Sequence, residues 1–268
     1  MRAVVRDLFV YPVKSCRGIA LDRAEVEMRG LRYDRRWMIV DGAGMFVTQR
    51  TEPRLTGITV TIDEAREALV LSAPGKRALH LALAPREGAR VKVQVWRDEV
   101  DAVHAGDKAA RWVSAFLGAP ASIVFMPDAV ERPVRPDFAR AGDHVSFADA
   151  FPLLLTTTDS LDDLNARLDQ ALPMNRFRPN VVVTGCMPWE EDDWRRARVG
   201  GVPLRLPKAC DRCVVTTTDQ LTGERGVEPL RTLARFRKWT DSKVYFGVNA
   251  VPDARGTIAV GDRLTVLE

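Results

Sequence analysis

The sequence predicts a mainly β, α+β protein of two parts with a few peripheral helices. Short runs of alternating or β-branched apolar residues recur along the 268-residue chain and fit strands. Turns that contain glycine, proline or asparagine separate these runs. Only about three segments show the apolar spacing of an amphipathic helix. The first of these helices ends near Gly118, so we place one domain at residues 1–118 and a second at residues 119–268.

The composition limits the class of protein. There are 40 Lys and Arg against 36 Asp and Glu, a net charge of +4, which fits an anionic small ligand better than bulk nucleic acid. No apolar run approaches the roughly 20 residues that span a membrane. Charged residues interrupt the apolar residues of the N-terminus, so it does not resemble a secretory signal. Four cysteines without a disulfide pattern favour a reducing compartment, and we expect a cytoplasmic protein.

The first domain is expected to begin with a strand over residues 2–12, and Lys14 and Ser15 follow at its end. A lysine, a hydroxyl and exposed backbone N–H groups suit a phosphate or another anion, although a solvated turn fits the same residues. Arg35 enters an apolar strand and therefore needs a partner, either Asp34 or an anionic ligand. Further strands are predicted at 19–28, 37–40, 45–49, 57–62, 68–72 and 91–96, and a helix capped by Asp107 ends at Gly118.

A proline-rich connection over 120–136 leads into the second domain. Its clearest helix is expected to be capped by Asp159 or Ser160 and to extend to Pro173. Arg178 precedes a proline, which predicts an extended backbone that directs the side chain. A turn and a buried strand are predicted over 145–155, strands at 181–185, 202–206, 214–218 and 244–250, a helix after Pro229, and a hairpin-like pair over 256–266.

Cys210 and Cys213 are expected on a tight loop between two strands, with Lys208 and Arg212 beside them. Nearby cations favour the thiolate, which is the form that binds metals. A structural zinc site would need two more ligands, but the other cysteines and the three histidines are scattered. A thioredoxin-like redox pair would stand at the start of a helix. The pair could also be two small, partly buried apolar residues, or Cys213 could be the single thiolate ligand of a soft metal other than zinc. The spacing alone does not decide between these interpretations.

Several separated motifs, in one order along essentially the whole chain, resemble a known family. The segments 11–18, 34–37 and 48–55 resemble the N-terminal β-barrel module that precedes a MOSC domain. The segments 176–180, 208–218, 246–249 and 256–261 resemble the MOSC domain itself, which is named for the C-terminal domain of molybdenum cofactor sulfurase.

This resemblance implies a β-rich fold of two β-barrel-like domains that binds a molybdenum–molybdopterin (pyranopterin) cofactor at the domain junction. It also implies an oxidoreductase that reduces N-hydroxylated compounds such as hydroxylamines, amidoximes and N-hydroxylated bases. By its place in the motif, Cys213 would be the catalytic residue and the molybdenum ligand. Asp211 is unfavourable beside an anionic cofactor unless it accepts a hydrogen bond from a pterin N–H. The cofactor-binding residues implied by motif position are Lys14, Ser15, Arg35, Phe151 (through its backbone), Arg178, Asn180, Asp211, Arg212 and Asn249.

The sequence also bears on partners. No cysteine set for an iron–sulfur cluster accompanies the motifs, so we expect electrons from a separate ferredoxin- or flavoprotein-type donor. The substrate is expected to be a small N-hydroxylated molecule, and we expect no membrane partner. Two other functions compete. The first is a non-catalytic module that binds or carries the cofactor or transfers sulfur to it. The second is a nucleic-acid-binding β-barrel whose six tryptophans stack bases, which the modest net charge disfavours.

Overall fold

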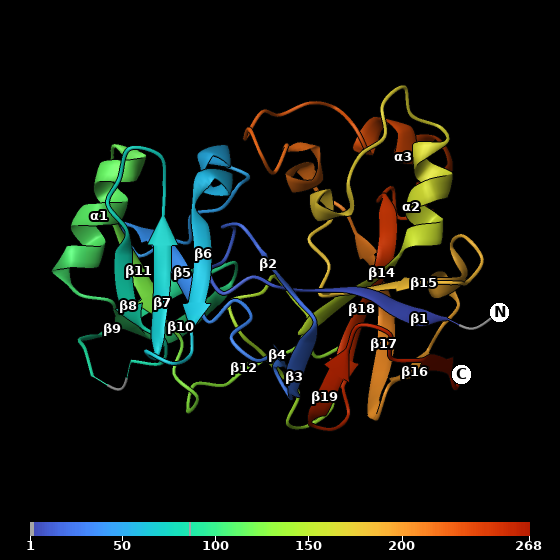
Figure 1. Cartoon of the computed structure of the whole chain (residues 1–268), viewed down its shortest axis with the longest axis horizontal. Coiled ribbons are helices and arrows are strands. Elements are labelled where there is room, and N and C mark those ends of the chain that lie inside the picture. The colour runs from blue at the N-terminus through green and yellow to red at the C-terminus, as the bar shows by residue number, and fades with distance from the viewer. Residues whose placement is uncertain (1–2, 86) are drawn as a thin grey trace.

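An eight-stranded sheet forms one of the two lobes of the protein in the computed structural model, which describes residues 3–85 and 87–268 (Figure 1). Its neighbouring strands are antiparallel except for the parallel pair β14–β15. Buried Leu155, Val183 and Val248 belong to the core on one side of this sheet. In order across the sheet, its strands are β2 (Ile19–Leu21), β1 (Val4–Val10), β15 (Val181–Thr184), β14 (Leu153–Thr157), β18 (Tyr245–Pro252), β17 (Val202–Asp211), β16 (Arg196–Val199) and β20 (Leu264–Val266).

The other lobe contains two antiparallel sheets and helix α1 (Asp107–Leu117), which packs against β11 and β8. Ile39, Leu69 and Val113 are fully buried and place strands of both sheets and the helix around one core. Gly118 ends α1 in the left-handed conformation that favours glycine. The first sheet is β5 (Trp37–Asp41), β11 (Ala121–Phe125), β10 (Asp98–His104) and β9 (Arg90–Val95), and the second is β6 (Thr59–Asp63), β7 (Ala68–Ser72) and β8 (Leu79–Ala82).

Two smaller sheets lie near the middle of Figure 1. Val26 and Ile258 of the first of them enter the core of the eight-stranded sheet. The first small sheet has the order β19 (Gly256–Ala259), β3 (Arg23–Glu27) and β4 (Gly30–Leu31), and the second pairs β12 (Arg132–Pro133) with β13 (His144–Val145).

Helices α2 and α3 pack on the lobe of the eight-stranded sheet, where Leu161, Leu164 and Leu233 surround the stacked rings of Phe177 and Phe246. No helix in the described part of the chain is both long enough and apolar enough to cross a bilayer. The helices of this lobe are α2 (Thr158–Asn165) and α3 (Leu230–Phe236), and the 3₁₀ helices are η1 (Pro53–Gly57), η2 (Met174–Arg176), η3 (Glu190–Asp192) and η4 (Val214–Thr217).

The prediction of a mainly β protein with a few helices is confirmed, but several local predictions are wrong. The strand predicted at 45–49 does not form, and only isolated bridges of Met45 and Phe46 are present there. The strand predicted at 19–28 is divided into β2 and β3, and the N-cap of α1 is Gly106 instead of Asp107.

The run 214–218 forms the 3₁₀ helix η4 instead of a strand. Its threonines explain this, because the hydroxyls of Thr216 and Thr217 donate to the carbonyl oxygens three residues earlier, at 3.0 and 2.8 Å. The clearest helix is capped by Thr157 and ends at Asn165, whose side-chain amide exchanges two hydrogen bonds with the backbone of Leu172.

The segment 256–266 does not form a hairpin. The carboxylate of Asp262 accepts from the backbone N–H of Ala259 at 2.8 Å and closes a turn between the two strands. After this turn, β19 pairs with β3, whereas β20 pairs with β16 at the edge of the large sheet. The two strands therefore belong to different sheets.

The first strand of the chain completes the lobe formed mainly by residues 153–268. In Figure 1 the blue strand β1 lies with the orange and red strands, and Val4 is the register partner of Thr184. The chain then crosses to the other lobe, where the backbones of Lys14 and Trp37 exchange a 2.8 Å hydrogen bond. The boundary at residue 118 stays a prediction.

Candidate functional site

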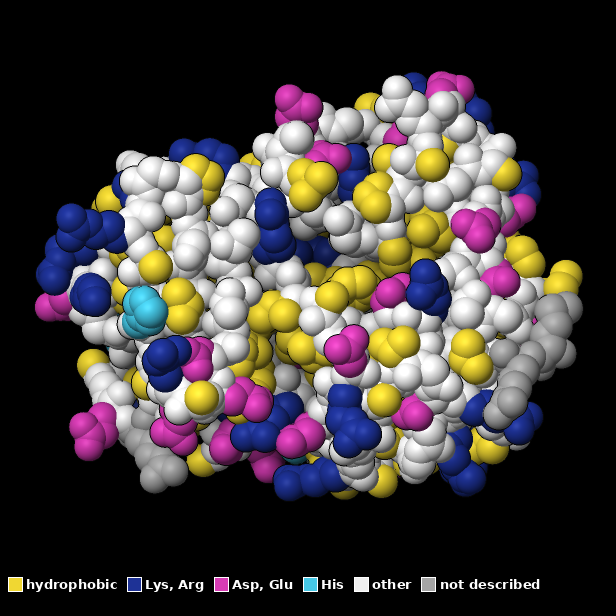
Figure 2. All heavy atoms as spheres, viewed as in Figure 1, with side chains coloured by type: hydrophobic (Ala, Val, Ile, Leu, Met, Phe, Trp, Pro, Cys, Tyr) yellow, Lys and Arg dark blue, Asp and Glu magenta, His cyan; other side chains and the backbone are white. Residues whose placement is uncertain are grey.

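A cavity of about 720 Å³ opens between the two lobes, which is within the range of ligand and cofactor sites. In Figure 2, Lys and Arg side chains lie in the depression between the lobes. Cations outnumber anions among the residues that line the cavity, so the site favours a ligand with more than one negative charge. The cationic lining residues are Lys14, Arg35, Arg50, Arg97, Arg132, Arg135, Arg178, Lys208 and Arg212, and the anionic ones are Asp98, Asp149 and Asp211.

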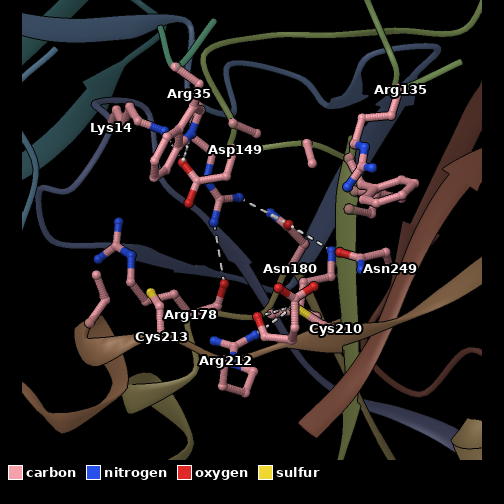
Figure 3. A pocket seen from close by; sticks show the side chains of 18 of the residues that line it. Lys14, Arg35, Arg135, Asp149, Arg178, Asn180, Cys210, Arg212, Cys213 and Asn249 are labelled. Atoms are coloured by element: carbon pink, nitrogen blue, oxygen red, sulfur yellow. Dashed lines mark hydrogen bonds and ion pairs between the residues drawn. The ribbon is translucent and has the colours of Figure 1, made fainter. Parts of the chain in front are cut away.

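The ten residues predicted from the motifs all line this one cavity. They come from segments far apart in the sequence, which meet where the strands of the large sheet end against the other lobe. Figure 3 shows most of these side chains around the cavity. Lys14 and Ser15 follow β1, Arg35 precedes β5, Phe151 precedes β14, Arg178 and Asn180 precede β15, Asp211, Arg212 and Cys213 lie at the end of β17, and Asn249 is in β18.

Arg178 has a different backbone conformation from the one predicted. It follows η2 and Phe177, its N–H donates to the carbonyl of Asn175 at 3.3 Å, and its φ of 55° is left-handed instead of extended. Its guanidinium lies 4.2 Å from the ring centroid of Tyr11, and burial lowers the pKa of Arg178 to about 10. The buried Nη2 has no hydrogen-bond partner within residues 3–85 and 87–268. An anionic ligand in the cavity would supply one.

Arg35 is paired inside the protein. Its Nη1 donates to Asp34 at 2.5 Å and to Asn180 Oδ1 at 3.0 Å. Burial alone would lower the pKa of Arg35, but the adjacent Asp34 carboxylate outweighs it and raises that pKa. The side-chain amide of Asn180 also donates to the carbonyl of Phe9 and to Asp34, and it accepts from the N–H of Leu154. Asn180 is thus saturated, and its contribution is to hold Arg35 in position.

Asp149 connects three other side chains of the cavity. Lys14 pairs with it and donates to the carbonyl of Phe147 at 2.7 Å, Arg50 Nη2 donates at 2.8 Å, and Trp96 Nε1 at 3.2 Å. Burial lowers the pKa of Lys14 to about 8. Desolvation would raise the pKa of Asp149, but nearly half of its side chain stays exposed and the two cations hold that pKa well below its usual range.

We expect the unfolding free energy to depend on pH because the ammonium group of Lys14 is buried. The pKa is about 8 in the folded protein and 10.5 in the reference state, so between these values the unfolded chain binds more protons and stability rises with pH. Relative to Lys14→Met, the wild type should gain about 2–3 kcal/mol between pH 7 and pH 10. Urea denaturation of both proteins across this range measures the difference. Lys108→Met is the control, because Lys108 is exposed on α1. Parallel curves for the wild type and Lys14→Met would contradict the expectation.

The two thiols are held by different arginines. Strand β17 extends to Asp211, so Cys210 lies in the strand and not on a loop, whereas Cys213 immediately precedes η4. Cys213 Sγ accepts from Arg50 Nη2 at 3.3 Å, and Cys210 Sγ accepts from Arg212 Nη1 at 3.0 Å. In the view of Figure 3 the two sulfur atoms lie on either side of Arg212. Burial raises the pKa of Cys210, although Arg212 opposes the shift.

The negative charge of Asp211 is compensated by two lysines. Its carboxylate lies 2.8 Å from Lys208 Nζ and 3.3 Å from Lys243 Nζ. Desolvation would raise the pKa of Asp211, but these two ammonium groups lower it. The charge conflict that the sequence raised is therefore resolved by neighbouring residues. Asn249 also lies here, and its Nδ2 donates to the carbonyl of Lys208 at 3.2 Å.

Comparison with known proteins identifies the family of this chain. Residues 2–120 match the MOSC N-terminal beta barrel domain, and residues 142–265 match the MOSC domain. The chain belongs to the MOSC family. Human mitochondrial amidoxime-reducing component 1 is 36% identical over 280 residues, which cover 98% of this chain and 82% of the human protein. Bovine mitochondrial amidoxime reducing component 2 is 34% identical over 276 residues, which cover 96% and 81% of the two chains. The resemblance inferred from the motifs is confirmed.

Among the residues of this MOSC site that were not predicted, Arg50, Asp149 and Trp96 contact one another. Arg50 lies within the MOSC-type segment 48–55, so its motif marked the region but not its contact with Cys213. Asp149 lies in the polar turn before β14, and Trp96 follows a strictly alternating strand, so neither position carried a chemical signal in the sequence.

The donor set also separates the interpretations of the thiol pair. No group of three or more His, Cys, Asp and Glu side chains gathers in the part of the chain that the structure describes, which argues against a conventional zinc site. Both Arg178 Nη2 and Arg212 Nε are buried without a hydrogen-bond partner in these same residues. A thiol beside unpaired guanidinium donors fits a ligand that combines a soft metal with an anionic organic group.

Proposed function

We propose that this protein is a molybdenum-cofactor-dependent oxidoreductase that reduces N-hydroxylated compounds. The observation that carries the proposal is that Cys213 opens into the same cavity as the arginines and lysines predicted to hold an anionic cofactor. The names of its MOSC relatives, the amidoxime-reducing components, support the reaction class. For an amidoxime, two electrons and two protons break the N–O bond and give an amidine and water.

In this proposal Cys213 binds the molybdenum, and Lys14, Arg178 and Arg212 hold the anionic pyranopterin together with Ser15 and Arg35. The bound cofactor supplies the two-electron chemistry, and the protein supplies binding and orientation. The guanidinium of Arg35 is fixed by Asp34 and Asn180, so little ordering remains to be done when a ligand arrives. Phe151 and Asn249 frame the cavity wall, and a separate ferredoxin- or flavoprotein-type protein delivers the electrons.

The test uses protein purified from a host that makes the molybdenum cofactor. We expect stoichiometric molybdenum by mass spectrometry, and conversion of benzamidoxime to benzamidine when reduced methyl viologen supplies electrons. Protein from a host that lacks the cofactor is the control for reduction by the dye alone. Molybdenum without turnover would favour the carrier or sulfur-transfer alternative. Protein that binds no molybdenum would overturn the cofactor assignment itself.

A further inference from the structure

We propose that Trp96 is a substrate contact that favours planar aromatic N-hydroxylated compounds over aliphatic ones. This inference rests on the proposed function. It begins with the turn between β9 and β10, where Val95 is the register partner of Asp98 and leaves Trp96 and Arg97 as the two turn residues. Trp96 has φ = 56°. Two-residue hairpin turns take glycine, asparagine or aspartate at such positions, so a tryptophan is an outlier here. Strained residues of this kind concentrate at functional sites.

The side chain of Arg50 links the ring of Trp96 to the thiol of Cys213. The guanidinium carbon of Arg50 is 4.7 Å from the ring centroid, and Arg50 Nη2 is 3.3 Å from Cys213 Sγ. The indole Nε1 donates to Asp149 Oδ1 at 3.2 Å. Trp96 therefore lies beside Arg50, the residue that bonds the thiol proposed to bind the metal. Arg50 and Asp149 fix the orientation of Trp96.

Much of this aromatic surface stays available. Trp96 is 44% exposed although it lines the cavity, and Phe46 supports it with a centroid distance of 5.0 Å. The neighbouring cavity wall is formed mainly by charged side chains such as Arg50, Arg97 and Asp149. The part of the indole that Arg50 and Phe46 leave open is thus an apolar surface in a polar site, and Arg50 lies between the ring and Cys213. Stacking on such a surface stabilises an aromatic ring but gives little to a short alkyl group.

The experiment compares two probes, benzamidoxime and acetamidoxime, with cofactor-loaded protein. We expect the wild type to prefer benzamidoxime in kcat/KM. Trp96→Leu should reduce the ratio of the two kcat/KM values by about tenfold, the effect of losing one stacking contact. Trp96→Phe should keep most of the preference, because it retains a ring but lacks the indole N–H that bonds Asp149. The ratio isolates the stacking contact, because a disturbed Asp149 affects both substrates.

Trp239→Leu is the matched control. Trp239 is 41% exposed and stacks on Tyr245 at 4.0 Å, but it does not line the cavity, so the ratio should not change. Calorimetric binding of benzamidoxime to the wild type and to Trp96→Leu gives a second readout that needs no turnover, and we expect about tenfold weaker binding to the variant. An unchanged ratio and unchanged binding in a folded Trp96→Leu protein would overturn the inference and leave the proposed function intact. Binding that depends on Trp96 without any reduction would support the contact and reject the function.

Discussion

Cys213→Ser is expected to abolish the reduction of N-hydroxylated substrates while the protein stays folded. A hydroxyl is a poor ligand for a metal that prefers sulfur. Changes to groups that only orient a metal ligand cost about 10–100-fold, so loss of the ligand itself should lower kcat by more than about 100-fold. The side chain of Cys213 is partly exposed in the cavity, so the unfolding free energy should change by less than about 1 kcal/mol. Steady-state kinetics, molybdenum content and urea denaturation measure the three quantities.

Cys210→Ser is the matched control for this variant, since it changes the neighbouring thiol in the same way. Cys210 Sγ bonds Arg212 and lies within β17, so we expect a loss of activity of no more than about tenfold. The opposite order of effects would show that Cys210 is the ligand. Equal and small losses in both variants would show that neither thiol is required for the reaction.

Phe177→Ala is expected to lower the unfolding free energy by about 3–5 kcal/mol. Phe177 and Phe246 are fully buried and stack with a centroid distance of 3.8 Å between α2, α3 and the large sheet. Truncation would leave a cavity that rigid neighbours such as Leu164 and Leu233 cannot fill. Guanidinium denaturation at neutral pH measures the loss.

Phe138→Ala makes the same chemical change at a half-buried position. Phe138 contacts Phe151 edge to face at 5.7 Å near the cavity, and we expect a loss of only about 1–2 kcal/mol. Losses of similar size in the two variants would contradict the account of the Phe177 core. Phe177→Ala should also weaken the site, because the carbonyl of Phe177 accepts from Arg212 at 2.6 Å and Arg178 is the next residue.

Patterns that depend on neighbours along the chain could be predicted from the sequence. Strict alternation marked β9, and the apolar spacing together with Gly118 marked α1. The positions of Lys14, Arg35 and Cys213 came from the family motifs, because composition and spacing left their roles open. Local propensity failed where side chains bond their own backbone, as the hydroxyls of η4 do.

Contacts between distant segments could not be predicted from one sequence. Arg50 and Cys213 are 163 residues apart, and their hydrogen bond depends on how the two lobes meet. The same is true of Trp96 and Asp149, and of the different partners of β19 and β20. A single sequence records which residues alternate, but it does not record which edges and turns face one another.

The place of β1 in the large sheet has a consequence for how the protein is made. A ribosome delivers β1 long before its neighbour β15, since Val4 pairs with Thr184. Strand β2 can pair with one edge of β1 early, but the other edge has no hydrogen-bonding partner until the residues up to β15 have been synthesised. The long separation in sequence between β1 and β15 gives this pairing a large loop-closure cost, which slows folding. During translation this unpaired edge of β1 is prone to aggregation, which a chaperone would prevent.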